Sequence, residues 1–256
     1  MRRLKLLILG MVLGLVVCGC EKEKPQVKEP EKTEETKKQQ ARKEADMGIS
    51  IQWLGHASFK IRQDKTIIYI DPWKLKDSPK DATLVLVSHS HSDHYSAEDI
   101  GKVSGPQTKL IASADVVAKE KGGEAITPGV TIKANDVRIT GVPAYNPSKQ
   151  FHPKANNWVG FVIEVGGKRI YYAGDTDVTG EMKALKNIDV ALLPVGGKYT
   201  MNADEAAEAT KVMNPKQAIP YHYGDIVGSR SDADRFANLA APGVKILKPG
   251  ETVSIE

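Results

Sequence analysis

The sequence contains very little cysteine, and what it has lies at one end. Cys18 and Cys20 are the two cysteines of the 256-residue chain, and none follows them. The rest of the chain therefore has no disulfide framework, no thiol nucleophile and no thiolate metal ligand. A cysteine-free domain must be held by its hydrophobic core, which a segment of roughly 200 residues can supply.

The chain also lacks a large excess of positive charge. The formal net charge is +4, and three of the positive residues, Arg2, Arg3 and Lys5, stand at the start. Removal of that start leaves a charge near +1 (4 − 3). Such a balance offers no electrostatic footprint for nucleic acid, so we expect no nucleic-acid partner and do not favour nuclease activity.

A long hydrophobic run is missing as well. Residues 6–17 form an apolar run of 12 residues broken only by glycine, whereas a bilayer-spanning helix needs roughly 20. With its positive start, this run has the form of an export signal. Val17 and Gly19 before Cys20 resemble a bacterial lipobox. This predicts a cleaved lipoprotein signal peptide over residues 1–19 and a lipid on Cys20; an ordinary secretory signal is the alternative.

Residues 20–47 comprise the predicted lipidated cysteine, Cys20, and a charged linker that follows it. Residues 21–46 contain eight acidic and eight basic residues and no aromatic residue. This composition cannot bury apolar surface, so we expect a disordered, solvated tether. The domain over residues 48–256 would then lie outside the cytoplasm in the bacterial cell envelope, anchored to a membrane through Cys20. Translation from Met47 would instead give a cytoplasmic protein.

The remaining sequence shows the periodicities of a folded domain. Alternation of apolar and polar residues over 49–62 and a second run over 65–71 predict antiparallel strands. The continuous apolar run at 81–88 predicts a buried strand. Strand-like and helix-like segments follow one another through the rest of the chain, and residues 244–256 are expected to close as a hairpin. This mixture predicts one mixed α/β domain.

Half of the chain's six histidines lie on one short stretch. His89, His91 and His94 fall within six residues, with Asp93 among them, directly after the buried strand. His89 and His91 are two apart in an extended chain and therefore point to one side, and the next two can face a second point where the chain turns. Imidazole and carboxylate ligands together suit zinc, manganese or iron. The H-x-H-x-D-H spacing thus predicts a metal site.

This motif resembles that of the metallo-β-lactamase superfamily, and the resemblance extends from Ile49 to Glu256. Further stretches are similar to the metal-dependent hydrolase branch near ascorbate-phosphate lactonase: WLGHASF (53–59), IDP (70–72), AGDTD (173–177), DVALLPVGGKYTM (189–201) and PYHYG (220–224). The resemblance implies an α/β fold, a four-layer αβ/βα sandwich in which two mixed sheets pack face to face with helices outside. Periodicity alone does not give this topology.

The resemblance also implies a centre of two divalent metal ions, most simply zinc, with manganese and iron as alternatives. The ligands that it carries over are His89 and His91 for the first ion, Asp93, His94 and His222 for the second, and Asp175 as a bridge. A catalytic site of this kind takes three protein ligands and keeps a position for water. The first ion therefore still needs a third histidine.

That third ligand is the open position. In the lactonase-like pattern a histidine closely follows a strand that ends in "PA"; here Asn146 stands at about that place and His152 comes six residues later. Only one histidine lies between His94 and His222 in the sequence, so His152 is assigned as the third ligand of the first ion. An imidazole also suits these metals better than an amide oxygen does. Asp177 is a rival to Asp175 and is interpreted as a turn residue.

Two metal ions roughly 3.5–4 Å apart can hold a hydroxide between them and polarise the scissile bond. The resemblance therefore implies a hydrolase that uses a metal-bridging hydroxide on an ester, lactone or phosphodiester bond. The substrate would be a small molecule or a lipid-derived compound. Asp93 would also orient the hydroxide, and His56 would carry protons or support a ligand at the mouth of the site. A non-catalytic metal- or ligand-binding envelope lipoprotein is the alternative, and the oligomeric state is left open.

Other side chains are assigned more loosely. Loop residues that the resemblance brings near the metals are candidates for substrate contact: Tyr145, Asn146, Lys198, Tyr199 and Thr200. Trp53 and Trp158 are interpreted as core residues.

The export signal yields a first prediction, acylation of Cys20. Cells fed a clickable fatty acid should incorporate label into the native protein, because the Gly19–Cys20 junction directs the modification. The Cys20→Ala variant should lose both the label and its membrane association. Persistence of label in that variant, or a native product that begins at Met47, would contradict the assignment.

Overall fold

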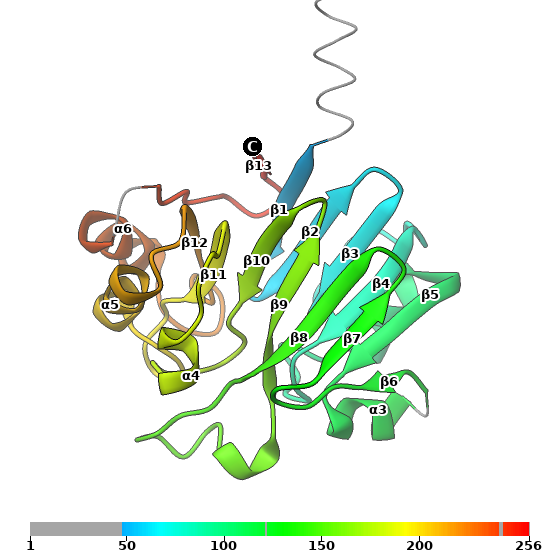
Figure 1. The fold of residues 1–256 in the computed structure, drawn as a ribbon, viewed down its shortest axis with the longest axis horizontal. Helices are drawn as coiled ribbons and strands as arrows, with labels where there is room; N and C mark the ends of the chain where they lie inside the picture. Colours follow the sequence, from blue (N-terminus) through cyan, green and yellow to red (C-terminus); the bar gives the residue numbers. More distant parts are fainter. Residues whose placement is uncertain (1–47, 121, 241–242, 256) are drawn as a thin grey trace, which may run out of the picture. The chain divides into compact units, whose positions relative to one another are not determined.

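A computed structural model of the protein describes residues 48–120, 122–240 and 243–255. The predicted signal peptide and tether at residues 1–47 lie outside the described residues. The described chain forms two mixed β-sheets packed face to face, with helices outside them (Figure 1). No helix in this part of the chain is long and apolar enough to cross a bilayer.

The first sheet has seven strands in the order β13-β1-β2-β3-β4-β5-β6. Its strands are β1 (Ile49–Gly55), β2 (Ser58–Gln63), β3 (Thr66–Ile70), β4 (Ala82–Val87), β5 (Ser104–Ala112), β6 (Glu124–Ala125) and β13 (Thr252–Ile255). The first three are antiparallel, as the alternating pattern predicts, and β3, β4 and β5 run parallel. The parallel strands end at the same edge of the sheet, and the histidine motif begins there.

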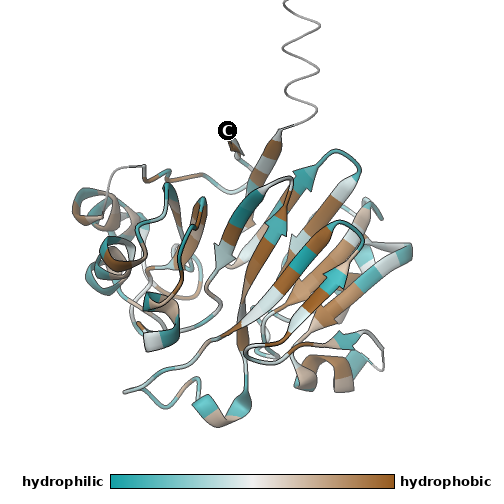
Figure 2. Cartoon of the chain, viewed as in Figure 1, coloured by the Kyte–Doolittle hydropathy of each residue, from teal (hydrophilic) through white to brown (hydrophobic). Residues whose placement is uncertain are grey.

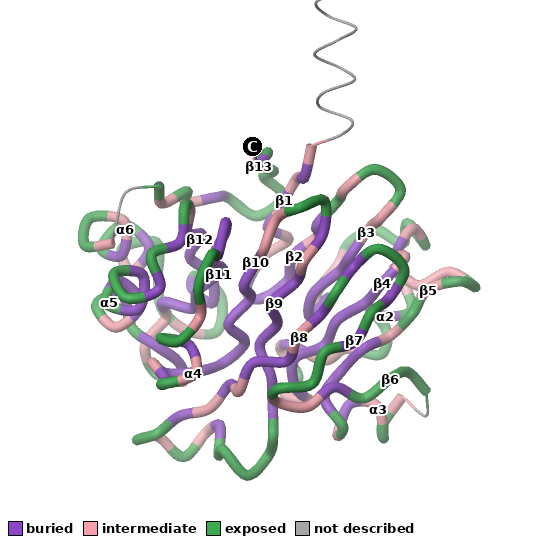
Figure 3. Tube along the Cα trace, in the orientation of Figure 1, coloured by how far each residue is buried: buried purple, intermediate pink, exposed green. Residues whose placement is uncertain are grey.

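The second sheet has six strands in the order β12-β11-β10-β9-β8-β7. They are β7 (Thr131–Ala134), β8 (Val137–Pro143), β9 (Val159–Val165), β10 (Lys168–Tyr172), β11 (Val190–Pro194) and β12 (Gln217–Tyr221). Strands β10, β11 and β12 are parallel. Burial follows position in the sheet: all five residues of β11 are buried, whereas the edge strand β7 alternates between exposed and buried residues (Figure 3).

Helices cover the outer faces of both sheets. On the first sheet lie α2 (Ala97–Val103) and α3 (Ala114–Glu120); with the second sheet lie α4 (Gly180–Lys183), α5 (Ala203–Met213) and α6 (Arg230–Leu239). A 3-10 turn, η1 (Lys154–Asn156), lies between β8 and β9. Side-chain caps fix the helix starts: Ser96 accepts from the backbone of Asp99, and Asn202 forms a capping box with Glu205.

The main core fills the space between the sheets, where apolar segments of the strands gather (Figure 2). Four aromatic side chains pack there: Phe59, Phe161, Tyr172 and Tyr221. The rings of Tyr172 and Tyr221 stack with centroids 5.1 Å apart, and Phe59 meets Tyr221 edge-on at 5.6 Å. This geometry adds to the free energy gained by burying the rings. The predicted four-layer sandwich is confirmed.

The expected hairpin over residues 244–256 is wrong. Val244 forms only an isolated bridge with Ala218, and β13 pairs antiparallel with β1 instead of with a neighbour in sequence. The reason is that the open edge of β1 is available to a strand from far along the chain. Strand β5 was not expected either, because much of it is polar or exposed and it contains Gly105 and Pro106.

The close approach of strands β9 and β10 leaves no room for a side chain at Gly160. A Cβ added at Gly160 on β9 would lie 2.5 Å from the carbonyl oxygens of Tyr172 and Ala173, whereas one added at Gly180 meets nothing within 4 Å. Gly160→Ala should therefore lower the free energy of unfolding by about 1–3 kcal/mol. Gly180→Ala, the matched control, should change it by less than about 0.5 kcal/mol. Urea denaturation measures both, and equal effects would refute the packing explanation.

Candidate metal centre

The chemically important side chains gather where strands of both sheets end. His56 follows β1, Asp71 follows β3, the histidine motif follows β4, Asp175 follows β10 and His222 follows β12. His152 comes from the loop between β8 and β9. The structure thus brings together all seven residues that the sequence assigns as ligands, from four separate segments of the chain.

The first group joins three histidines. Ligand atoms of His89, His91 and His152 all lie within 4.8 Å of one another. His89 Nε2 is 3.1 Å from His91 Nδ1. Burial lowers the pKa of His89 well below its usual value, which favours the neutral ring that metal binding requires.

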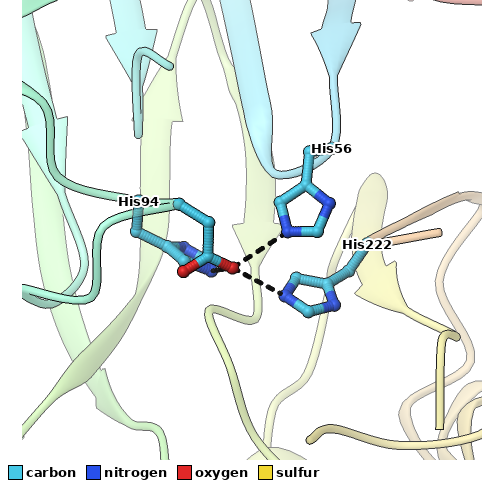
Figure 4. A group of neighbouring side chains, drawn as sticks. His56, His94 and His222 are labelled. Atoms are coloured by element: carbon cyan, nitrogen blue, oxygen red, sulfur yellow. Dashed lines mark hydrogen bonds and ion pairs between the residues drawn. The ribbon is translucent and has the colours of Figure 1, made fainter. Parts of the chain in front are cut away.

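The second group joins Asp93 and three histidines. Asp93 Oδ2 lies 3.0 Å from His56 Nε2, 3.6 Å from His222 Nε2 and 3.7 Å from His94 Nε2. Figure 4 shows the rings of His56, His94 and His222 turned toward a common point. Imidazole nitrogens around a carboxylate make a donor set that can hold a divalent cation.

Asp175 lies between the two groups. Its carboxylate is 3.1 Å from His94 Nε2, 3.2 Å from His222 Nε2 and 3.3 Å from His152 Nε2. Burial would raise the pKa of Asp175, but the charges of His222 and His94 outweigh it and hold that pKa well below the usual range. Asp175 is therefore a buried anion that touches residues of both groups.

The donor atoms fit a metal better than they fit one another. Among the described residues, buried atoms without a hydrogen-bond partner include the Nε2 atoms of His94, His152 and His222 and the Oδ1 atom of Asp175. Buried polar atoms without a partner are rare in native proteins. These atoms are close to each other but not aligned for hydrogen bonds, which is the arrangement that cation binding requires. The cluster can bind metal.

Asp71 is the important residue that sequence reasoning missed. It is fully buried, and its Oδ2 atom accepts hydrogen bonds from His94 Nδ1 at 2.7 Å, from the Ser88 hydroxyl at 2.6 Å and from the Tyr172 hydroxyl at 2.5 Å. This contact fixes the ring of His94 with Nε2 facing the cluster, as carboxylates do for metal-bound histidines. The signal was present: the IDP stretch places an aspartate at the end of an apolar strand.

Asn146, the rival ligand, acts on His152 instead. Its Oδ1 atom accepts from the backbone N–H of His152 at 3.0 Å and from His152 Nδ1 at 2.8 Å, while its Nδ2 atom donates to the carbonyl of Tyr199. The amide thereby places the proton of His152 on Nδ1 and leaves Nε2 to face Asp175. Asp177, interpreted from the sequence as a turn residue, is held in an ion pair with Lys149 at 2.6 Å.

The backbone is unusual at three of these positions. His56, Asp71 and His222 have φ angles of 45°, 43° and 62°. Histidine and aspartate tolerate this left-handed region better than most residues, yet it remains costly, and such residues gather at functional sites. The backbone N–H of His222 donates to the carbonyl of His56 at 3.0 Å, which ties two of the three turns together.

The two tryptophans interpreted from the sequence as core residues differ in their contacts. Trp53 is part of the main core, as predicted. Trp158 is buried, but its ring lies against those of His89, His91 and His152, at centroid distances of 4.8, 4.7 and 5.6 Å. Its Nε1 atom donates to Asp115. Trp158 therefore forms a wall of the first histidine group.

The loop residues proposed for substrate contact differ in burial and in the contacts that they make. Tyr145 bonds through its hydroxyl to Glu181, Thr200 is buried, and Lys198 is exposed. Tyr199 packs edge-on against Phe151 and accepts the hydrogen bond from Asn146.

Comparison with known proteins agrees with the site. Residues 50–222 match the family model described as a β-lactamase superfamily domain. UPF0173 metal-dependent hydrolases of Pyrococcus abyssi and Thermoplasma acidophilum are 36% and 38% identical, over 81% and 78% of this chain and 100% and 95% of theirs. The structure of Igni18, a metallo hydrolase from Ignicoccus hospitalis, is 30% identical with a TM-score of 0.67, covering 81% of this chain and 98% of that one.

The matching domain, the sandwich fold and the histidine–aspartate cluster at the strand ends point the same way. The chain belongs to the metallo-β-lactamase superfamily, among the UPF0173 metal-dependent hydrolases.

Proposed function

We propose that the protein is a dinuclear metal-dependent hydrolase. The observation that carries the proposal is the position of Asp175, whose carboxylate lies within 3.3 Å of histidines from both groups. A single carboxylate in contact with two donor sets is the arrangement expected of a bridging ligand. A non-catalytic binding protein has no need for such a shared ligand.

The two donor sets divide the ligands between two ions. His89, His91 and His152 would hold the first ion, Asp93, His94 and His222 the second, and Asp175 would touch both. Ions bound there would lower the pKa of a shared water toward neutrality and polarise the oxygen of the scissile bond. The imidazole-rich set favours zinc, with manganese and iron as alternatives.

Asp93 and His56 would assist the reaction from one side of the cluster. The Nε2–H of His56 donates to Asp93 Oδ2 at 3.0 Å, which orients the carboxylate. Burial lowers the pKa of His56, so the ring is neutral near pH 7. Its Nδ1 atom has no hydrogen-bond partner among the described residues. His56 can therefore take up a proton at Nδ1 or release one to a leaving group.

The substrate class that we propose is an ester, lactone or phosphodiester. The motifs similar to ascorbate-phosphate lactonase support a lactone or phosphate-bearing substrate over a β-lactam. The near-neutral charge of the domain argues against nucleic acid. If Cys20 is lipidated, the domain faces away from the cytoplasm, and small-molecule or lipid-derived esters of the cell envelope become the natural substrates.

The function is tested by metal loading and turnover. Protein loaded with zinc, manganese or iron should carry two ions per chain and hydrolyse at least one member of a panel of esters, lactones and phosphodiesters. His152→Ala should lower metal content toward one ion and cut turnover at least about a hundredfold, because the first ion loses its third histidine.

Asn146→Ala provides the matched control in the same loop. It removes the group that orients His152 but leaves the ligand itself, so two ions should still bind at saturating metal, with the first held about 10–100-fold more weakly. Retention of two ions and near-native turnover by His152→Ala would show that the first site is built from other residues. A fully loaded protein inactive on the whole panel would favour the non-catalytic alternative.

A further inference from the structure

A pocket of about 200 Å³ lies next to the metal cluster and outside the ligand set. Four rings line it: Trp53, His56, Trp73 and Tyr223. The ring centroids of Trp53 and Tyr223 are 5.1 Å apart, and those of His56 and Trp73 are 5.2 Å apart. Rings from three separate segments of the chain thus contribute to its walls, and Trp73 is the one that is only partly buried.

His56 connects this pocket with the reaction site. The same ring that lines the pocket contacts Asp93 through Nε2 at 3.0 Å and lies 4.1 Å from the ring of His222. A substrate whose scissile bond lies over Asp93 can therefore place an attached group in the pocket, one imidazole ring away. Trp73 is only partly buried and the Asp93 side chain retains 17% exposure, so both residues reach solvent.

The walls and the size of the pocket select its occupant. A closed apolar cavity of about 150 Å³ is large enough for benzene, so this pocket has room for one six-membered ring with a short link. Ring-lined walls favour an aromatic occupant, because offset and edge-to-face contacts add to the burial of apolar surface.

The charged rim does not offer a free site for an anion. Lys74 is the cation at the pocket, and its Nζ atom lies 3.0 Å from both carboxylate oxygens of Asp225. The same ammonium lies 4.1 Å from the centre of the Trp73 ring. Lys74 is thus paired with Asp225 and lies over the ring of Trp73, so the rings are the apolar contact that the pocket offers an occupant.

We propose that this pocket is a specificity subsite that binds an aryl group of the substrate, attached within a few bonds of the scissile linkage. The inference rests on the proposed hydrolase function and adds a substrate class to it: aryl-substituted esters or phosphodiesters. Trp73 is the specificity-determining residue, because it forms the partly exposed wall against which the ring packs.

The experiment compares substrates that differ only in one group, benzyl against methyl, within whichever ester or phosphodiester class is hydrolysed. The native enzyme should show a KM for the benzyl substrate at least about tenfold lower. Trp73→Ala should raise that KM about tenfold and leave kcat, metal content and the methyl substrate unchanged, whereas Trp73→Phe should keep most of the preference. Ile226→Ala, an exposed residue beside Asp225 that does not line the pocket, is the matched control and should behave as the native enzyme.

A readout without turnover separates the subsite from the catalytic proposal. Phenylacetate, but not acetate, should shift the NMR signal of the Trp73 indole N–H, assigned by its loss in Trp73→Phe. This shift in a protein that hydrolyses no substrate would support the pocket and overturn the hydrolase function. Equal KM values for the benzyl and methyl substrates in the native enzyme would overturn the subsite. A rise in KM that is the same for both substrates in Trp73→Ala would also overturn it. A preference for long alkyl chains over the aryl group would also overturn it.

Discussion

The site depends on one buried carboxylate. Asp175 lies within 3.3 Å of histidines that belong to two donor groups, and burial deprives it of the water that would otherwise stabilise its charge. An isolated buried carboxylate would be protonated or very costly. Here the surrounding histidines keep it ionised, so a negative charge lies between two groups of imidazole nitrogens. Cations placed on either side would satisfy the donor atoms that otherwise lack partners.

The fold serves this carboxylate by bringing strand ends together. The stacked core of Phe59, Tyr172 and Tyr221 fixes the two sheets face to face. Tyr172 also links that core to the site, because its hydroxyl donates to Asp71, which in turn orients His94. Packing between the sheets and alignment of the His94 ring are therefore coupled through one side chain, and a loose core would disturb that ring directly.

Sequence reasoning found the histidines and aspartates of the cluster because their chemistry is rare and local. The H-x-H-x-D-H stretch needs no tertiary information, and the scarcity of histidine made His152 the natural third member. The supporting contacts were harder to foresee. Asp71 lies in a short stretch that resembles many strand ends, and Trp158 looks like any core aromatic until its contacts with three histidines are known. The pairing of β13 with β1 was missed for a related reason, since a long-range strand pair leaves no mark in local periodicity.

The central claim is that two metal ions share Asp175. The most direct measurement is anomalous X-ray diffraction from crystals of the zinc-loaded protein, recorded on both sides of the zinc absorption edge. Two anomalous peaks should appear about 3.5–4 Å apart, one beside His89, His91 and His152 and the other beside Asp93, His94 and His222, each in contact with the Asp175 carboxylate. A single peak at full zinc occupancy, or two peaks of which only one touches Asp175, would contradict the account.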